Sequence, residues 1–276
     1  MTEKTKDKLM SDVRDFMKEE CFENPSLETR ILFRHILCDQ DNVLELTNEH
    51  IKRINHHMNE LKKGMPIQRQ LGFTEVRDRK INITQDVLLP GPEIEILLDT
   101  FFDYVKNPKR VVDLCTGCGV LASIIGEAFP NTKVYASDIS KKALEVAKTN
   151  IRSGNVQLLE GDLFEPLEKL GIYNLDVLIS NPPYCKTEDI EKLPRQIKDY
   201  TPRIAIDGGE DGYSFHRRII RDSSNFVKIG GLMILENEAG QTKKLCNMLQ
   251  SNRYYIECTR KNHRGEERVV VARRTK

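Results

Sequence analysis

From residue 110 onward, short apolar runs alternate with segments of helical character, and this alternation constrains the fold more than any other feature. Strands are predicted at 111–114, 133–137, 156–159, 175–180 and 232–236, with helices at 121–129, 141–151, 213–228 and after Gly240. Strands that alternate with helices form a mostly parallel sheet covered on both faces. The sequence therefore predicts a doubly wound α/β domain, which the runs 252–258 and 267–272 close as an antiparallel pair.

The first predicted strand ends in a glycine-bearing turn. Residues 111–120 read Val-Val-Asp-Leu-Cys-Thr-Gly-Cys-Gly-Val, and Gly117 and Gly119 let a ligand approach the backbone closely. The next strand ends at Asp138, about 20 residues beyond the turn, where an acidic residue accepts hydrogen bonds from ribose hydroxyls. These features indicate a nucleoside cofactor. Ala122 stands where the dinucleotide fingerprint has its third glycine, a change that disfavours NAD and leaves it open.

The predicted strand 175–180 runs into Asn181-Pro182-Pro183-Tyr184, at a strand end where open α/β sheets bind ligands. The Asn181 oxygen and the Pro182 carbonyl can each accept one N–H of a planar amide or amino group. The prolines fix the direction of the carbonyls, and the Tyr184 ring offers a flat surface. Such a nitrogen attacks a methyl donor well only when it is held and aimed. The segment favours N-methylation, and a Pro-rich turn with an ordinary Asn is the alternative that it leaves open.

Together, the cofactor turn, the acidic strand end and the Asn-Pro-Pro-Tyr segment resemble class I S-adenosylmethionine-dependent methyltransferases. More narrowly, the chain resembles the family that methylates the glutamine of the Gly-Gly-Gln loop in peptide chain release factors. Three further stretches carry this resemblance, at 87–95, 201–212 and 230–236. The Asp-Gly-Gly-Glu-Asp-Gly sequence at 207–212 is the specific one, because DNA adenine methyltransferases share Asn-Pro-Pro-Tyr. One departure is Gly91, where the family usually has Arg between the two prolines.

The resemblance implies a Rossmann-like seven-stranded methyltransferase sheet with its last strand antiparallel, preceded by a small helical bundle. It implies methyl transfer from S-adenosylmethionine to a glutamine side-chain amide N5, with S-adenosylhomocysteine as product. The expected catalytic residues are Asn181, Pro182 and Tyr184, and Pro183 joins them in binding the substrate. The expected cofactor-binding residues are Asp113, Cys115, Thr116, Gly117, Cys118, Gly119, Asp138, Ile139, Asp162, Leu163 and Asn181. For Asp162, expected to accept from the adenine amino group, a solvated turn residue is an equal alternative.

Before residue 64 the apolar residues recur at helical spacing in three stripes, around Leu9, Ile31 and Ile54. Ser26 and Thr47 are candidate N-caps. Alternating residues at 72–77 and 80–83 predict a two-stranded ribbon. We therefore expect a helical domain at 1–63, a β-ribbon linker at 64–92 and an α/β domain at 93–276. The resemblance implies that the helical domain binds the protein substrate and that the α/β domain is the methyltransferase domain. The polar, irregular stretch 185–203 is a candidate substrate loop.

Charge limits the partners, because 43 basic and 42 acidic side chains give a net charge of +1. Direct nucleic-acid binding is therefore disfavoured. The basic residues near the end of the chain fit a solvated face, with a ribosome-linked or acidic protein partner as the alternative, and they are Lys261, Arg264, Arg268, Arg273 and Arg274. No run has the length of a membrane span or the pattern of a signal peptide, so the expected location is the cytoplasm, without a membrane partner.

The chain has seven cysteines, an odd number that does not suggest a disulfide framework. Cys115 and Cys118 form a C-x-x-C, which a redox pair or half of a zinc site would also show. No second close pair completes a zinc site, so we expect no metal and treat both as small residues of the turn. Cys185 follows Tyr184 directly and is expected to be a bystander, with an exposed, reactive thiol as the alternative.

The expected partner is therefore a release factor, the protein substrate. The alternatives are methylation of another planar nitrogen, in a ribosomal-protein glutamine or adenine N6 of nucleic acid, and a non-catalytic cofactor-binding assembly protein. An NAD-dependent oxidoreductase is the least favoured.

Overall fold

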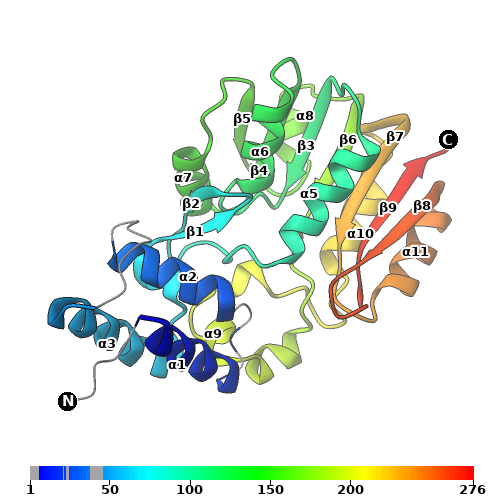
Figure 1. The fold of residues 1–276 in the computed structure, drawn as a ribbon. Coiled ribbons are helices and arrows are strands. Elements are labelled where there is room, and N and C mark those ends of the chain that lie inside the picture. Colours follow the sequence, from blue (N-terminus) through cyan, green and yellow to red (C-terminus); the bar gives the residue numbers. More distant parts are fainter. Residues whose placement is uncertain (1–5, 21, 23–24, 38–45) are drawn as a thin grey trace. The chain divides into compact units, whose positions relative to one another are not determined.

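A computed structural model describes residues 6–20, 22, 25–37 and 46–276 (Figure 1). The chain separates into two compact units. One comprises Met1–Gln85 with Lys192–Thr201, and the other comprises Asp86–Glu191 with Pro202–Lys276.

The first unit is a helical bundle with a β-ribbon. Its elements are α1 (Lys6–Glu19), α2 (Pro25–Ile36), α3 (Asn48–Lys62), α4 (Ile67–Leu71), β1 (Phe73–Val76), β2 (Arg79–Asn82) and α9 (Arg195–Lys198). The three predicted apolar stripes supply its core, where Val13, Leu32 and Ile54 are at most 1% exposed. The antiparallel ribbon is also present.

Thr47 caps α3 as predicted, because its hydroxyl accepts a hydrogen bond from the His50 amide. The prediction for Ser26 was wrong, since α2 already begins at Pro25 and Ser26 lies in its first turn. Proline suits a first helical position because the missing N–H has no partner there in any helix.

The second unit contains a seven-stranded sheet in the order β5-β4-β3-β6-β7-β9-β8. The strands are β3 (Arg110–Leu114), β4 (Lys133–Asp138), β5 (Val156–Glu160), β6 (Leu175–Ser180), β7 (Val227–Glu236), β8 (Tyr254–Lys261) and β9 (Glu267–Arg274). Neighbours from β5 to β7 are parallel, and β9, the last strand of the chain, runs antiparallel to β7 and β8. The predicted fold class is confirmed.

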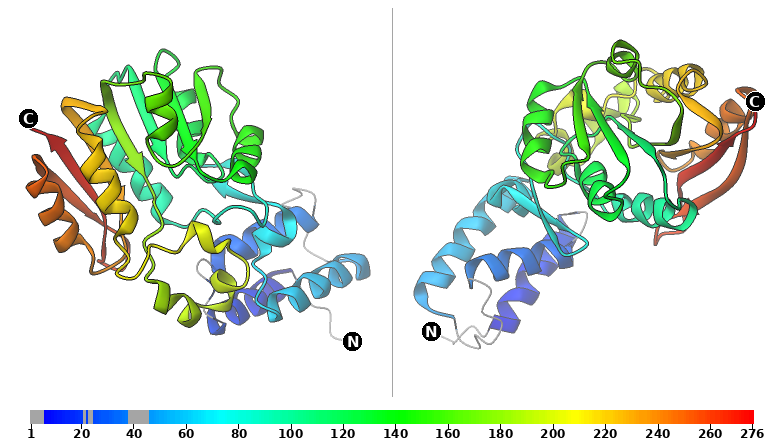
Figure 2. Two further views of the ribbon diagram at one scale, coloured as in Figure 1. Left: turned by 180° about the vertical axis from the view of Figure 1, so that it is seen from behind. Right: turned by 90° about the horizontal axis from the view of Figure 1, so that it is seen from above.

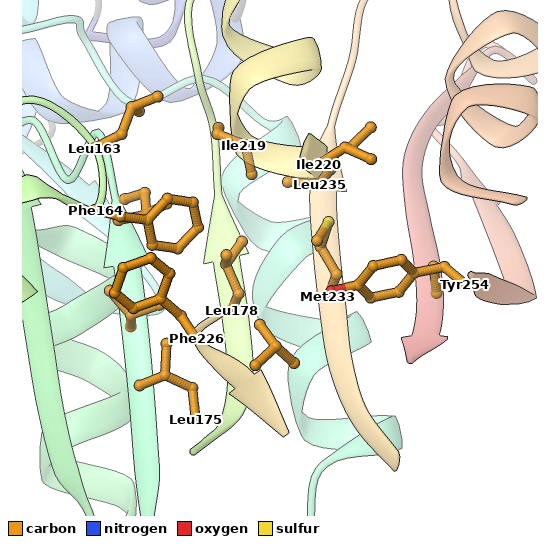
Figure 3. Packing of buried hydrophobic residues seen from close by; sticks show 14 of the residues in the cluster. Leu163, Phe164, Leu175, Leu178, Ile219, Ile220, Phe226, Met233, Leu235 and Tyr254 are labelled. Carbon is orange, nitrogen blue, oxygen red and sulfur yellow. The ribbon is translucent and has the colours of Figure 1, made fainter. Parts of the chain in front are cut away.

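Helices cover both faces of this sheet (Figure 2). They are α5 (Glu93–Tyr104), α6 (Val120–Ala128), α7 (Lys141–Asn150), α8 (Glu165–Lys169), α10 (Ser214–Ser223) and α11 (Thr242–Ser251). Side chains of α8, α10 and α11 join a cluster with alternate strand residues such as Leu178 and Met233 (Figure 3). Within it, the Phe164 and Phe226 rings stack with centroids 4.5 Å apart. Helices α5, α6 and α7 pack on the opposite face of the sheet.

Two segments differ from the sequence prediction. The helix expected at 213–228 ends at Ser223, and β7 begins at Val227. Phe226 and Val227 are at most 5% exposed, so their burial in the sheet core outweighs continuation of the helix. The stretch 185–203 is not structureless, since it contains the 3₁₀ helix Thr187–Lys192 and the short helix α9.

Across the described ranges, no helix has both the length and the apolar character needed to cross a membrane.

Candidate active site

The carboxyl ends of four parallel strands meet at one edge of the sheet. Leu114 of β3 pairs with Ser137 of β4 on one side and with Ser180 of β6 on the other, and β7 continues this row. The residues that follow the row are, in strand order, Asp138, Cys115, Asn181 and Glu236. Strands are spaced about 4.8 Å apart, so the backbones of Asp138 and Asn181 lie about 10 Å apart. The structure thus brings the two predicted halves of the site together.

The turn after β3 uses its two glycines differently. Gly117 and Gly119 have φ of 56° and 76°, in the left-handed region that glycine adopts without strain. A Cβ on Gly119 would lie 2.8 Å from the Ala147 Cβ, so Gly119 lets the turn pack against α7. A Cβ on Gly117 would meet no atom within 4 Å. The open side of the turn therefore lies at Gly117.

Asp113, in β3, is 1% exposed and ties the turn to the start of α6. Its Oδ2 accepts hydrogen bonds from Thr116 Oγ1 at 2.6 Å and from the Ala122 amide at 3.3 Å. Its Oδ1 is buried and has no hydrogen-bond partner in the part of the chain that is described. Burial, and secondarily the nearby Asp138 carboxylate, raises the pKa of Asp113 to about 7. A buried oxygen of this kind suits a ligand that donates a hydrogen bond.

Asp138 ends β4 and holds the other side of the turn. Its two carboxylate oxygens accept from the backbone amides of Gly117 and Ser140, each at 2.9 Å. Burial raises the pKa of this carboxyl, although the amides oppose that shift. Ile139, the next residue, is 53% exposed. The carboxylate is thus oriented by backbone, with lone pairs left for further donors.

Asp162 and Leu163 follow β5. Leu163 is buried with φ of 51°, and its carbonyl accepts from Ser137 Oγ at 2.9 Å. The Asp162 carboxylate forms an ion pair with Arg218 of α10. Sequence reasoning missed Arg218, because it lies 56 residues from Asp162 with no local motif between them.

The Asn181 side chain is partly exposed. Among the described residues, none forms a hydrogen bond with this side chain. Pro182 and Pro183 are buried, and Ser180 is anchored by donating Oγ–H to the Leu114 carbonyl at 2.7 Å. The Asn181 amide therefore stays available on a backbone that is held in place.

Tyr184 is held by its phenol. The hydroxyl donates to Glu236 Oε1 at 3.0 Å and accepts from Arg268 Nη2 at 3.0 Å. Burial, followed by the Glu236 charge, raises the pKa of Tyr184 well above its usual 10. The Arg268 side chain is 14% exposed, so placing it on a solvated face was wrong. Its charge is offset by Glu236 at 3.6 Å and by Glu93 at 3.8 Å.

The backbone after Tyr184 packs against residues 207–212. Cys185 N donates to the Ile206 carbonyl at 3.0 Å, and Gly208 N donates to the Cys185 carbonyl at 2.7 Å. Asp207 accepts from Thr187 Oγ1 at 2.6 Å and pairs with Arg203 at 3.2 Å. Residues 207–212, the stretch most specific to the family, thus lie along the Asn-Pro-Pro-Tyr segment and are joined by backbone hydrogen bonds to the residue that follows it. We call residues 207–212 the clamp.

The cysteines of the described ranges were the candidates for a metal site. Among the residues whose structure is described, no group of three or more His, Cys, Asp or Glu side chains could hold a metal ion. Cys185 is 6% exposed, and burial raises the pKa of the Cys115 thiol. Cys21 and Cys38 lie outside the described residues.

Comparison with known proteins places this geometry in context. The family described as methyltransferase small domain matches residues 93–198. The chain is 34% identical to the release factor glutamine methyltransferase of Clostridium acetobutylicum, over 89% of this chain and 90% of that protein. The protein of the same name from Geobacter sulfurreducens is 30% identical over 99% of both chains.

Two solved structures share the fold. The methyltransferase from Pyrococcus furiosus aligns with a TM-score of 0.52 and 18% identity, over 80% of this chain and 98% of that one. The hMettl16 catalytic domain, solved with the MAT2A 3'UTR hairpin 6, aligns with a TM-score of 0.53 and 15% identity, over 75% and 77% of the two chains. At these identities the likeness supports the fold alone.

Proposed function

The chain belongs to the release factor glutamine methyltransferase family, and on this premise we propose that it methylates N5 of the glutamine in the Gly-Gly-Gln motif of peptide chain release factors. S-adenosylmethionine is the methyl donor. The observation that carries the proposal is the uncommitted Asn181 amide, at the same sheet edge as the buried, half-satisfied carboxylate of Asp113.

The residues at this edge fit the cofactor. Its amino group is a donor that would satisfy the buried Asp113 Oδ1, and its ribose hydroxyls would bind Asp138. The turn from Cys115 to Gly119 would lie along its amino acid part, where Gly117 leaves open space. Ile139, Asp162 and Leu163 would surround the adenine. When bound, the cofactor supplies an electrophilic methyl group on a sulfonium.

The chain's own residues would prepare the glutamine amide. Asn181 Oδ1 would accept one N–H and the Pro182 carbonyl would accept the other, which would hold the amide nitrogen in one fixed orientation. The same two acceptors would also stabilise positive charge that develops on this nitrogen during methylation. Tyr184 keeps its proton at working pH because its pKa is raised well above 10, so it packs and positions without acting as a base.

Each of the three expected segments of the chain has its own role in this proposal. The helices at 1–63 bind the release factor, the ribbon at 64–92 links them to the rest, and residues 93–276 carry out the transfer. The site of action is the cytoplasm, where release factors work.

The test combines purified protein and labelled S-adenosylmethionine with two release factors, one intact and one with the Gly-Gly-Gln glutamine replaced. We expect label on the intact factor alone. Equal labelling of both factors would overturn the proposal, and label on an added oligonucleotide but on neither factor would move the assignment to a nucleic-acid adenine.

A further inference from the structure

An ionic cluster lies beside the Asn-Pro-Pro-Tyr segment and consists of three charged side chains from three elements. Glu93 begins α5, Glu236 ends β7, and Arg268 lies near the start of β9. Their side chains are only 13%, 2% and 14% exposed. Arg268 lies 3.6 Å from Glu236 and 3.8 Å from Glu93.

A buried ionic cluster of this kind contributes little net free energy to the stability of a fold. Removing charges from water costs several kcal/mol for each ion, and apolar residues of the same volume often stabilise as well or better. Burial alone would lower the pKa of Arg268, but Tyr184, Glu93 and Glu236 outweigh burial and raise it, so the guanidinium stays charged. A guanidinium that stays charged while it is buried suggests that Arg268 does more at this position than stabilise the fold.

The partner that Arg268 and Glu236 share is the Tyr184 phenol. Arg268 Nη2 donates to the hydroxyl oxygen at 3.0 Å, while the hydroxyl donates to Glu236 Oε1 at 3.0 Å. The guanidinium carbon lies 5.7 Å from the centre of the Tyr184 ring. Because the hydroxyl is an acceptor toward Arg268 and a donor toward Glu236, the phenol has one defined orientation.

The other end of Tyr184 is also held. Its backbone carbonyl accepts from the Gln241 side chain at 3.0 Å, and its Cα lies 2.6 Å from where a Cβ on Gly208 would stand. Fixing Tyr184 at both ends fixes the rigid prolines before it, and hence the Pro182 carbonyl and the Asn181 side chain.

We propose that Arg268 is a positioning residue for methyl transfer, acting through the Tyr184 hydroxyl to hold the amide-binding segment in its reactive geometry. This inference rests on the proposed function. Loss of Arg268 should lower kcat, while cofactor affinity and KM for the release factor change little, because the guanidinium pairs with Tyr184, Glu93 and Glu236 and is assigned to neither ligand.

The test measures kcat, KM, cofactor affinity by calorimetry and thermal stability for R268A, R268K, Y184F and the double variant R268A/Y184F. We expect a kcat loss of up to about 100-fold in R268A, the scale expected of a small misplacement of reacting groups. R268K should recover part of the rate, and the double variant should be no slower than the slower single variant.

Arg273 provides the matched control. It lies on the same strand and is 40% exposed, and its side chain pairs with Glu257 and donates to the Gly230 carbonyl. R273A should keep the wild-type kcat. If wild type and R273A both fail to methylate the release factor, the proposed function fails.

If wild type is active, the inference alone is at stake. It is overturned if Y184F keeps the full rate while R268A loses it, or if the two losses multiply in the double variant. If R268A does not fold, R268K and Y184F provide the test. The inference is supported if kcat decreases in both variants while cofactor affinity is unchanged, and any other result overturns it.

Discussion

Gln241, the residue before α11, donates a hydrogen bond from its side-chain Nε2 to the backbone carbonyl of Tyr184 at 3.0 Å, across 57 positions of sequence. The same side chain is 6% exposed, and its Oε1 accepts from the Glu238 amide at 3.2 Å. One amide thus links the loop after β7 to the proposed substrate segment.

Replacing this amide with a carboxylate tests the link. In Gln241→Glu, the donor facing the Tyr184 carbonyl becomes an acceptor, so two buried oxygens oppose each other. We expect a loss of about 1–3 kcal/mol in the free energy of unfolding, together with a lower kcat. Urea unfolding and single-turnover methylation measure the two effects. Gln250→Glu, on the exposed face of α11, is the control, and an equal effect there would contradict the prediction.

Gly208 tests the clamp formed by residues 207–212. In Gly208→Ala, the new Cβ would lie 2.6 Å from the Tyr184 Cα and 2.7 Å from its carbonyl carbon, and these backbone atoms cannot rotate away. We expect a cost of about 1–3 kcal/mol from overpacking, and reduced methylation because the substrate segment must shift. Gly154→Ala, where a Cβ meets nothing within 4 Å, should have neither effect. Wild-type methylation by the Gly208 variant would show that the clamp does not position Tyr184.

Local patterns predicted the sheet, the cofactor turn and the strand-end position of Asn181. Each depends on residues close in sequence: glycines that allow positive φ, apolar runs, and an Asp or Asn where a strand ends. The partners Arg218, Gln241 and Arg268 were not predicted, because they reach the site from 56, 57 and 84 residues away. Charge alone placed Arg268 on the surface. Its burial follows from β9 inserting between β7 and β8, which is a property of topology.

Asp113 should make stability depend on pH. Its folded-state pKa, about 7, lies above the ordinary aspartate value of 3.8, so between these pH values the folded protein holds a proton that the unfolded chain releases. Stability therefore falls as pH rises from about 4 to about 7, by an upper bound of about 4 kcal/mol. Asp113→Asn should remove this contribution. Urea unfolding of both proteins without cofactor, from pH 5 to 8, measures the difference, and parallel stability curves would refute the assigned burial effect.

Two substitutions of Asn181 separate the effect of its hydrogen-bond acceptor from the effect of its side-chain shape on methylation. Asn181→Leu keeps a similar volume but removes both the oxygen and the amide, so the glutamine nitrogen loses one of its two proposed acceptors. We expect kcat to fall about 100- to 1000-fold, the scale for removing one preorganised hydrogen-bonding partner of a transition state. Asn181→Asp keeps an acceptor at the same place and should retain more activity than the Leu variant.

Cofactor affinity, measured by calorimetry, should remain close to wild type in Asn181→Leu because Asp113 and Asp138 are unchanged. Equal rates in the Leu and Asp variants would mean that acceptance by residue 181 does not aim the nitrogen. A matched loss of cofactor affinity and rate would instead assign Asn181 to cofactor binding alone.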